Sequence, residues 1–168
     1  FSSSSRLYEN VPEKLGMTPA DYRSGARGLT MQYTIAPCSL GHVLVAVTEQ
    51  GICSVMLDDD ADTLIDKLRE EFHGAAIEAG DEALSEPLAG VLAYIEGKQP
   101  HVELPLDIRG TAFQQRVWQA LQQIPYGETR TYSEVAESMG RPEATRAVAS
   151  AIAHNHIAVV IPCHRVIR

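Results

Sequence analysis

Three short segments rich in Val, Ile, Thr and Tyr lie close together between residues 30 and 57. They run from Met31 to Pro37, from Val43 to Val47 and from Ile52 to Leu57. The stretches 39–41 and 49–51 separate them, and each contains a glycine. Short glycine-containing stretches between such segments are typical of hairpin turns. The pattern therefore predicts a meander of three antiparallel strands.

Helical periodicity replaces the strand pattern after residue 57. Apolar residues recur at helical spacing over 64–72, and the acids at 58–60 offer an N-cap for that helix. A second helix is predicted over 84–95, with Gly97 at its end, and a short strand over 101–106.

Two capping boxes mark helix starts in the C-terminal third of the chain. Thr111 is followed three residues later by Gln114, and Thr131 by Glu134. In this arrangement each side chain satisfies a backbone N–H group of the other residue. Both boxes precede apolar residues at helical spacing, so each predicts a helix.

A third helix is predicted over 143–153, because Gly140 ends the preceding helix and Pro142 suits a first helical position. Helix, short turn with glycine and helix form a helix-turn-helix pattern, which many helical hairpins share. The third helix consists largely of Ala, and Arg146 is its one long side chain. Small side chains suit tight packing of this helix on another helix, or a helix laid into a DNA groove with one projecting arginine.

Charge is distributed unevenly along the 168 residues, whose net charge is −8. Residues 57–106 hold 13 acids and 3 bases, whereas residues 107–168 hold 5 acids and 7 bases, all of them arginine. Arginine suits bidentate contacts, but a net charge of +2 alone is a weak footprint for a DNA-binding module. A hydrophobic share of 45% with 21% charged residues excludes collagen-like, coiled-coil and wholly disordered chains. No apolar run is long enough to span a membrane.

The three cysteines, at positions 38, 53 and 163, are widely spaced and odd in number. Without a C-x-x-C pair they indicate neither a disulfide framework nor a zinc site, and we expect a cytoplasmic protein without a metal. Cys38 and Cys53 fall in predicted strands, where a structural role is expected.

The first 27 residues resemble the end of a preceding unit. A short helix is predicted from Ser2 to Leu15, and the stretch 24–28 is a plausible linker. The chain begins with Phe1 rather than Met, so we expect it to be a fragment of a longer protein.

A reactive constellation is predicted near residue 163. The apolar run 157–161 is expected to form a buried, strand-like segment, and Cys163 follows it with His164 and Arg165 as neighbours. A thiol with an ordinary pKa near ~8.5 is mostly protonated at neutral pH, and a neighbouring base or cation corrects this. The residues alone leave two readings open, an activated nucleophile and a structural cysteine with a chance histidine beside it.

The sequence Pro162-Cys163-His164-Arg165-Val166 resembles the active-site signature of the O6-alkylguanine-DNA alkyltransferases. The resemblance covers roughly residues 30–168. It includes Arg146-Ala147-Val148, Thr131-Tyr132, Gly127-Glu128-Thr129, Phe113-Gln114-x-x-Val117-Trp118 and Pro105-Leu106-Asp107-Ile108-Arg109-Gly110. Residues 1–23 resemble the end of an AraC-type DNA-binding domain. That order implies a fragment of an adaptive-response regulator that joins transcription regulation and DNA repair.

The resemblance implies a mixed α/β (α+β) fold with two domains. A ribonuclease-H-like domain is expected over 28–106, after an AraC-type remnant and linker over 1–27. A winged-helix-like helix-turn-helix domain with the active site is expected over 107–168. The family continues beyond this point with a glycine-rich loop over the base pocket and a glutamate that orients the histidine, so we expect a C-terminal truncation.

The resemblance also implies a single-turnover repair reaction without a cofactor. Cys163 accepts the alkyl group of O6-methylguanine, or of O4-methylthymine, while His164 takes the thiol proton through a water molecule and Asn155 ties the third helix to the cysteine segment. The protein, expected to be a monomer, binds the minor groove of double-stranded DNA with the alkylated base flipped out. The implied DNA-binding residues are Arg146, which replaces the flipped base in the stack, Tyr132, which presses on a phosphate, and the small residues Ala147, Ser150 and Ala151.

Two alternatives remain at this stage. A Cys–His hydrolase is disfavoured because adjacent side chains of an extended segment point to opposite sides. A DNA-binding regulator fragment in which Cys163 is structural is the second alternative.

Overall fold

The computed structural model describes residues 26–80, 84–108 and 110–168. The predicted helix from Ser2 to Leu15 and the AraC-like stretch lie outside the described residues. Among the described residues no helix is long and apolar enough to cross a membrane.

The predicted meander is confirmed. Strands β1 (Thr30–Cys38), β2 (Gly41–Thr48) and β3 (Gly51–Asp58) pair antiparallel, with Ile35 opposite Leu44 and Val45 opposite Val55. A fourth strand that the sequence did not predict, β4 (Ala76–Ala79), runs parallel to β1 and gives the order β3-β2-β1-β4. Strand β3 is therefore an edge strand.

Each face of this sheet packs on different helices. Leu44 and Ala46 belong to a core cluster with α2 (Ala61–Glu71), whose N-cap is Asp60 as predicted. Val43 and Val45 point to the opposite face, because side chains alternate along a strand. On that face they meet α3 (Ser85–Ile95). We call β1–β4, α2 and α3 the sheet unit.

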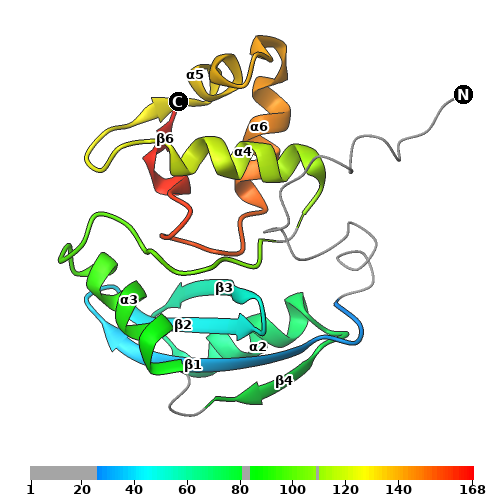
Figure 1. The fold of residues 1–168 in the computed structure, drawn as a ribbon, viewed down its shortest axis with the longest axis vertical. Coiled ribbons are helices and arrows are strands. Elements are labelled where there is room, and N and C mark those ends of the chain that lie inside the picture. The colour runs from blue at the N-terminus through cyan, green and yellow to red at the C-terminus, as the bar shows by residue number, and fades with distance from the viewer. Residues whose placement is uncertain (1–25, 81–83, 109) are drawn as a thin grey trace, which may run out of the picture.

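The remaining elements lie above the sheet unit in Figure 1 and form the helical unit. They are α4 (Ala112–Gln122), β5 (Arg130–Thr131), α5 (Tyr132–Ser138), η3 (Pro142–Ala144), α6 (Thr145–Ala153), η4 (Cys163–Arg165) and β6 (Val166–Ile167). Both capping boxes form. The third helix starts with one 3₁₀ turn, η3, before α6. Strand β6 pairs parallel with β5, which the sequence did not predict.

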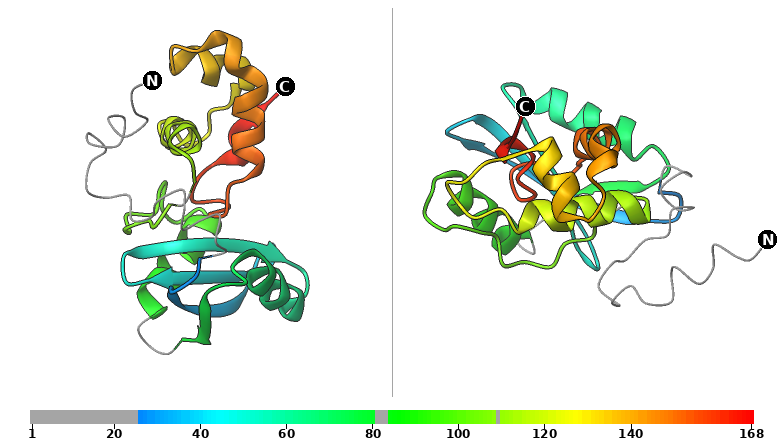
Figure 2. Two further views of the ribbon diagram at one scale, coloured as in Figure 1. Left: turned by 90° about the vertical axis from the view of Figure 1, so that its right-hand side faces the viewer. Right: turned by 90° about the horizontal axis from the view of Figure 1, so that it is seen from above.

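The helical unit packs around a buried tryptophan. Trp118 on α4 is almost fully buried, and its Nε1 donates to the Ala151 oxygen on α6 at 2.9 Å. Helix α5 packs on α6 as well. One core cluster continues from the sheet face with Val43 and Val45 to Trp118 and α6, so the two units share a hydrophobic core. Figure 2 shows the helical unit and the sheet unit one above the other.

The predicted strand over 101–106 is wrong. Only Leu106 forms a bridge there, to Ile52 on the edge of β3. Two hydrogen bonds, from Ile52 N to the Pro105 oxygen and from Asp107 N to the Ile52 oxygen, make this contact. The chain crosses the sheet edge at this point and does not run along it, which periodicity in the sequence does not reveal.

Candidate active site around Cys163

The segment before Cys163 is a turn, and the predicted strand over 157–161 is wrong. Only Ile157 forms a bridge, to Val55 on the edge of β3. Val159 then adopts φ +70°, a conformation that costs a β-branched residue energy. The Ile161 N–H returns to the Ile157 oxygen at 3.0 Å, so the chain folds back before it reaches the cysteine.

Asn155 holds both ends of this turn. Its Oδ1 accepts from the Ile157 N–H at 3.0 Å, and its Nδ2 donates to the Ile161 oxygen at 3.0 Å. A longer contact joins Nδ2 and the Ile157 oxygen at 3.4 Å. Asn155 comes just after the C-cap of α6, His154, so its amide links the end of that helix to the segment that carries Cys163.

Cys163 begins the 3₁₀ turn η4 and is half-buried. It lines a cavity of about 750 Å³ between the two units. The sheet unit contributes Leu40, Leu57, Tyr94 and Ile95, and the helical unit contributes Tyr126, Gly127, Glu128, Thr129, Ala158, Val159, Cys163, His164 and Arg165. The walls are mostly apolar, and three consecutive residues, Cys163, His164 and Arg165, bring a thiol, an imidazole and a guanidinium to one wall.

His164 follows Cys163 in the same turn and also lines the cavity. His164 is exposed at the rim of the cavity, but partial desolvation of its imidazole, and secondly the Arg165 charge, lower its pKa from the ordinary 6.5. The ring is therefore neutral at neutral pH and can accept a proton. No carboxylate in the described part of the chain forms a hydrogen bond or ion pair with His164.

The backbone argument against a hydrolase is wrong, because Cys163 and His164 are not extended. In a 3₁₀ helix adjacent side chains lie about 120° apart. No hydrogen bond between the two side chains is found, although both line one cavity.

Arg165 is a site residue to which the sequence assigned no role beyond that of a neighbouring cation. Its guanidinium is buried, donating from Nη1 to the Ile124 oxygen at 2.9 Å and from Nη2 to the Tyr94 hydroxyl at 2.6 Å. An arginine next to the candidate nucleophile was visible in the sequence, but its tyrosine partner lies 71 positions away. Only the packing of the two units brings them together.

Helix α6 has an exposed face that contains three of the predicted DNA-binding residues. Arg146, Ala147 and Ser150 are exposed there, followed by Ala153 and His154, which the sequence analysis did not name. His154 Nδ1 lies 2.7 Å from the Ser150 oxygen. Along α6 itself this surface has one long side chain, Arg146, among small ones, and the imidazole of His154 lies at its C-terminal end.

Ala151 and Tyr132 are placed differently. Ala151 is 2% exposed and packs in the core beside Trp118, so the expectation that it contacts DNA is wrong. It occupies the inner side of α6 with Val148 and Ile152. Tyr132, the first residue of α5, is half-buried and packs partly on the same core.

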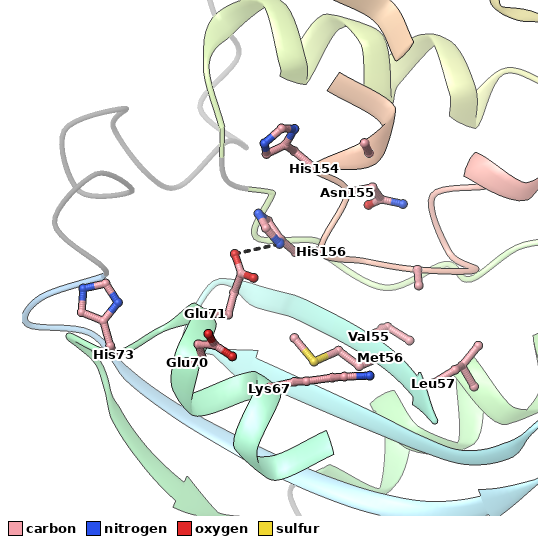
Figure 3. Close-up of a pocket in the computed structure, with 12 residues that line it drawn as sticks. Val55, Met56, Leu57, Lys67, Glu70, Glu71, His73, His154, Asn155 and His156 are labelled. Carbon is pink, nitrogen blue, oxygen red and sulfur yellow. Dashed lines mark ion pairs between the residues drawn. The ribbon is translucent and has the colours of Figure 1, made fainter. Parts of the chain in front are cut away.

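A second pocket lies on the other side of Asn155, between α2 and the end of α6 (Figure 3). There His156 Nδ1 lies 3.1 Å from the Glu71 Oε1. The ring of His156 also makes an edge contact with Phe72. Across the described residues, no group of three or more His, Cys, Asp and Glu side chains could hold a metal ion. The pocket contains a contact between the units, His156 with Glu71, which is an ion pair when His156 is protonated.

The other two cysteines lie away from this site. Cys53 on β3 is buried, with its thiol 3.4 Å from the Ala46 oxygen, and Cys38 ends β1. Neither lines the cavity of Cys163.

Comparisons with known proteins agree with this geometry. Residues 31–108 match the family model of the 6-O-methylguanine DNA methyltransferase ribonuclease-like domain, and residues 112–168 match that of the DNA-binding domain of the same family. The chain belongs to the O6-methylguanine DNA methyltransferase family. The expected family and mixed α/β fold class are thus confirmed.

Relatives and solved structures in this family match over different lengths. The bifunctional transcriptional activator/DNA repair enzyme Ada of Escherichia coli K12 is 47% identical over 168 residues, 100% of this chain and 48% of that protein. The chain thus spans about half the length of Ada. A methylated-DNA–protein-cysteine methyltransferase of Methanosarcina barkeri is 43% identical over 137 residues, 82% of each protein. The crystal structure of Mycobacterium tuberculosis O6-methylguanine methyltransferase superposes with a TM-score of 0.65 and 34% identity, covering 82% of this chain and 78% of that one. A structure of the Mycobacterium tuberculosis protein in complex with DNA gives 0.64 and 34%, over 83% and 78%.

Both family regions contribute to the cavity of Cys163. Leu40, Leu57, Tyr94 and Ile95 come from the ribonuclease-like region, and the thiol comes from the DNA-binding region. The segment that carries Cys163 therefore lies against residues of both family regions in this chain.

Proposed function

We propose that this chain is a DNA repair methyltransferase that moves the alkyl group of O6-methylguanine in DNA irreversibly to its own Cys163. The observation that carries the proposal is the position of Cys163, on a turn stapled by Asn155, in an apolar cavity shared with a neutral imidazole. Membership of the O6-methylguanine DNA methyltransferase family supports it. O4-methylthymine is a second candidate substrate.

The chemistry follows from the groups at the cavity. His164 accepts the thiol proton of Cys163 through one water molecule, which bridges two groups that do not bond directly. The sulfur then forms a bond to the methyl carbon, the bond from that carbon to O6 breaks, and its electron pair stays on guanine. The leaving guanine takes up the proton that Cys163 released. The thioether is stable, so each chain reacts once and requires no cofactor.

The exposed face of α6 supports a role in DNA binding. We propose that it lies in the minor groove, with Ala147 and Ser150 against the groove wall. Arg146 enters the stack where the alkylated base leaves it, because a base inside the duplex cannot reach Cys163. Tyr132, at the start of α5, presses on the phosphate next to the flipped nucleotide. A solved structure of a family member in complex with DNA supports DNA binding itself.

We further propose that residues 28–106 position the site as one domain and residues 107–168 bind DNA and carry the cysteine, in a monomeric cytoplasmic protein. A reducing compartment keeps free thiols, such as Cys38, Cys53 and Cys163, reduced.

The test is the intact mass after incubation with duplex DNA containing O6-methylguanine. We expect a gain of one methyl group per chain, mapped to Cys163. Cys163→Ser should abolish the gain and keep DNA binding, because a hydroxyl is a far poorer nucleophile than a thiolate. Cys38→Ser is the matched control and should react like the wild type. DNA binding without any mass gain would instead indicate a regulator fragment in which Cys163 is structural.

A further inference from the structure

Arg165 joins three parts of the molecule at the cysteine turn. It lies in η4 with Cys163, and its guanidinium donates to the Tyr94 hydroxyl on α3 and to the Ile124 oxygen just after α4. Its own N–H returns to the Pro162 oxygen at 3.0 Å. The turn that carries Cys163 is therefore connected to the sheet unit and to the helical unit through one side chain.

The charge of Arg165 is buried without a carboxylate partner among the described residues. Its side chain makes no ion pair there, and both of its hydrogen-bond acceptors are neutral oxygens. The guanidinium carbon also lies 5.2 Å from the ring centre of Tyr126 and 6.0 Å from that of Tyr94, within the range of cation–π attraction. A buried cation without an anion costs free energy, and an apolar side chain of similar volume avoids that cost. Packing alone does not explain an arginine here.

The location of this charge suggests what it does. Arg165 lines the same cavity as Cys163 and His164, and negative charge develops there when a thiolate forms. A fixed cation close to such a site stabilises that charge without reorganisation. Burial raises the pKa of Tyr94, so its hydroxyl is neutral and accepts the guanidinium hydrogen bond throughout the physiological range.

We propose that Arg165 and Tyr94 form a positioning pair, which fixes the Cys163 turn against α3 and keeps a positive charge at the wall of the cavity that Cys163 lines. The proposal rests on the proposed function, because it concerns the same cysteine. It gives the sheet unit a defined part in the reaction: Tyr94 acts on Cys163 through Arg165, without touching the substrate.

The two parts of the pair have separable effects. Tyr94→Phe keeps the ring and the charge of Arg165 but removes the hydrogen bond across the units. Arg165→Lys keeps the charge but cannot make both hydrogen bonds, to Tyr94 and to the Ile124 oxygen, at once. Arg165→Met removes the charge and both hydrogen bonds. The titratable and charged groups that line the cavity together with His164 are Tyr94 from α3, Tyr126 and Glu128 from the loop between α4 and β5, and Cys163 and Arg165 from its own turn. Glu128 is paired with Arg130 at 2.8 Å. Removing the Arg165 charge therefore raises the pKa of His164.

The experiment measures single-turnover alkylation of Cys163 by O6-benzylguanine between about pH 5 and 8, the range in which histidine titrates. Tyr94→Phe should slow the reaction about tenfold, the effect of one charge-assisted hydrogen bond, without moving the acid limb of the pH–rate profile. Arg165→Lys should behave in the same way. Arg165→Met should be slower still, with its acid limb displaced to higher pH. The control is Tyr33→Phe, on β1 beside the other core cluster, which should react like the wild type.

Wild-type rates for Tyr94→Phe would refute the positioning role, and an unmoved acid limb in Arg165→Met would refute the role of the charge. Thermal melts show which variants are folded, and Tyr94→Phe tests the pair even where Arg165→Met does not fold. Alkylation of Cys163 by iodoacetamide, followed by peptide mapping, is run on the same variants. If the wild type gains no methyl group from O6-methylguanine DNA, the proposed function fails, but the iodoacetamide rates still decide whether Tyr94 and Arg165 position the thiol.

Discussion

Asn155→Ala removes the side chain that closes the turn before Cys163. Two hydrogen bonds of 3.0 Å are lost, one from the Ile157 N–H and one to the Ile161 oxygen, together with the longer contact at 3.4 Å. A typical hydrogen bond contributes about 1 kcal/mol net to stability. A buried donor or acceptor that loses its partner and is not reached by water destabilises the fold by more than that. The strained Val159 lies inside the same turn and opposes its formation. We therefore expect a loss of about 2–3 kcal/mol in the free energy of unfolding.

The loss can be measured by urea denaturation and by single-turnover transfer from O6-methylguanine DNA. For a protein of this size it corresponds to a decrease in melting temperature of about 4–12 °C. Transfer should slow even at temperatures where the variant is fully folded, because the thiol no longer has one fixed position. Gln50→Ala, which truncates an exposed amide in the turn between β2 and β3, is the matched control and should change neither quantity. Wild-type stability and rate in Asn155→Ala would refute the reasoning, since the amide would then not hold the turn.

Three further predictions concern other parts of the molecule. Arg146→Ala should slow repair of duplex DNA about 10²-fold while leaving the reaction with free O6-benzylguanine unchanged, because only the duplex requires unstacking; equal losses on both substrates would contradict this. The pKa of His164 is lower in the folded chain than in the unfolded chain, so the unfolded chain takes up a proton at higher pH. The free energy of unfolding should therefore fall as pH drops below 6.5. In urea titrations His164→Gln should remove this part of the pH dependence. Gly51→Ala should cost about 1–3 kcal/mol in urea denaturation, because its φ is +144° and a Cβ there would lie 2.2 Å from the Pro105 oxygen. Gly28→Ala, also at positive φ but with open space around it, should cost less.

The elements that the sequence predicted well depend on local signals. The three strands follow from β-branched segments and glycine turns, and the two capping boxes from pairs only three residues apart. Strand β4 has no such signal, because Ala76–Ala79 is short and becomes a strand only by pairing with β1. The same holds for β5 and β6, which are two residues each.

The site was predictable in its residue types and much less in its geometry. Cys163, His164 and Arg165 stood out as a reactive cluster, whereas Asn155 was named only through the family resemblance. The apolar run 157–161 before Cys163 was interpreted as a strand. Continuous apolar composition fits a buried strand and a packed turn equally well. Asn155 decides between them, because its amide satisfies backbone groups that a strand would pair with a neighbour. A sequence pattern does not show whether these backbone groups bond to a side chain or to a neighbouring strand.

The edge of β3 explains how the sheet unit positions the site although Cys163 itself lies in the helical unit. An open strand edge leaves N–H and C=O groups unpaired, and proteins usually cover it. Here two crossings cover it: Ile52 pairs with the chain at Pro105 and Asp107, and Val55 pairs with His156 and Ala158.

The first crossing leads into α4, and the second follows α6. Both ends of the helix-turn-helix segment are therefore fixed to one strand, and side chains strengthen each attachment. Thr48 donates to Asp107 at 2.7 Å at the first crossing, and the ion pair of His156 with Glu71 lies at the second. Because Asn155 lies beside the second crossing, the sheet sets the position from which the cysteine turn is built. Arg165 and Tyr94 then fix the far end of that turn to the same unit, so the sheet unit controls Cys163 from both sides.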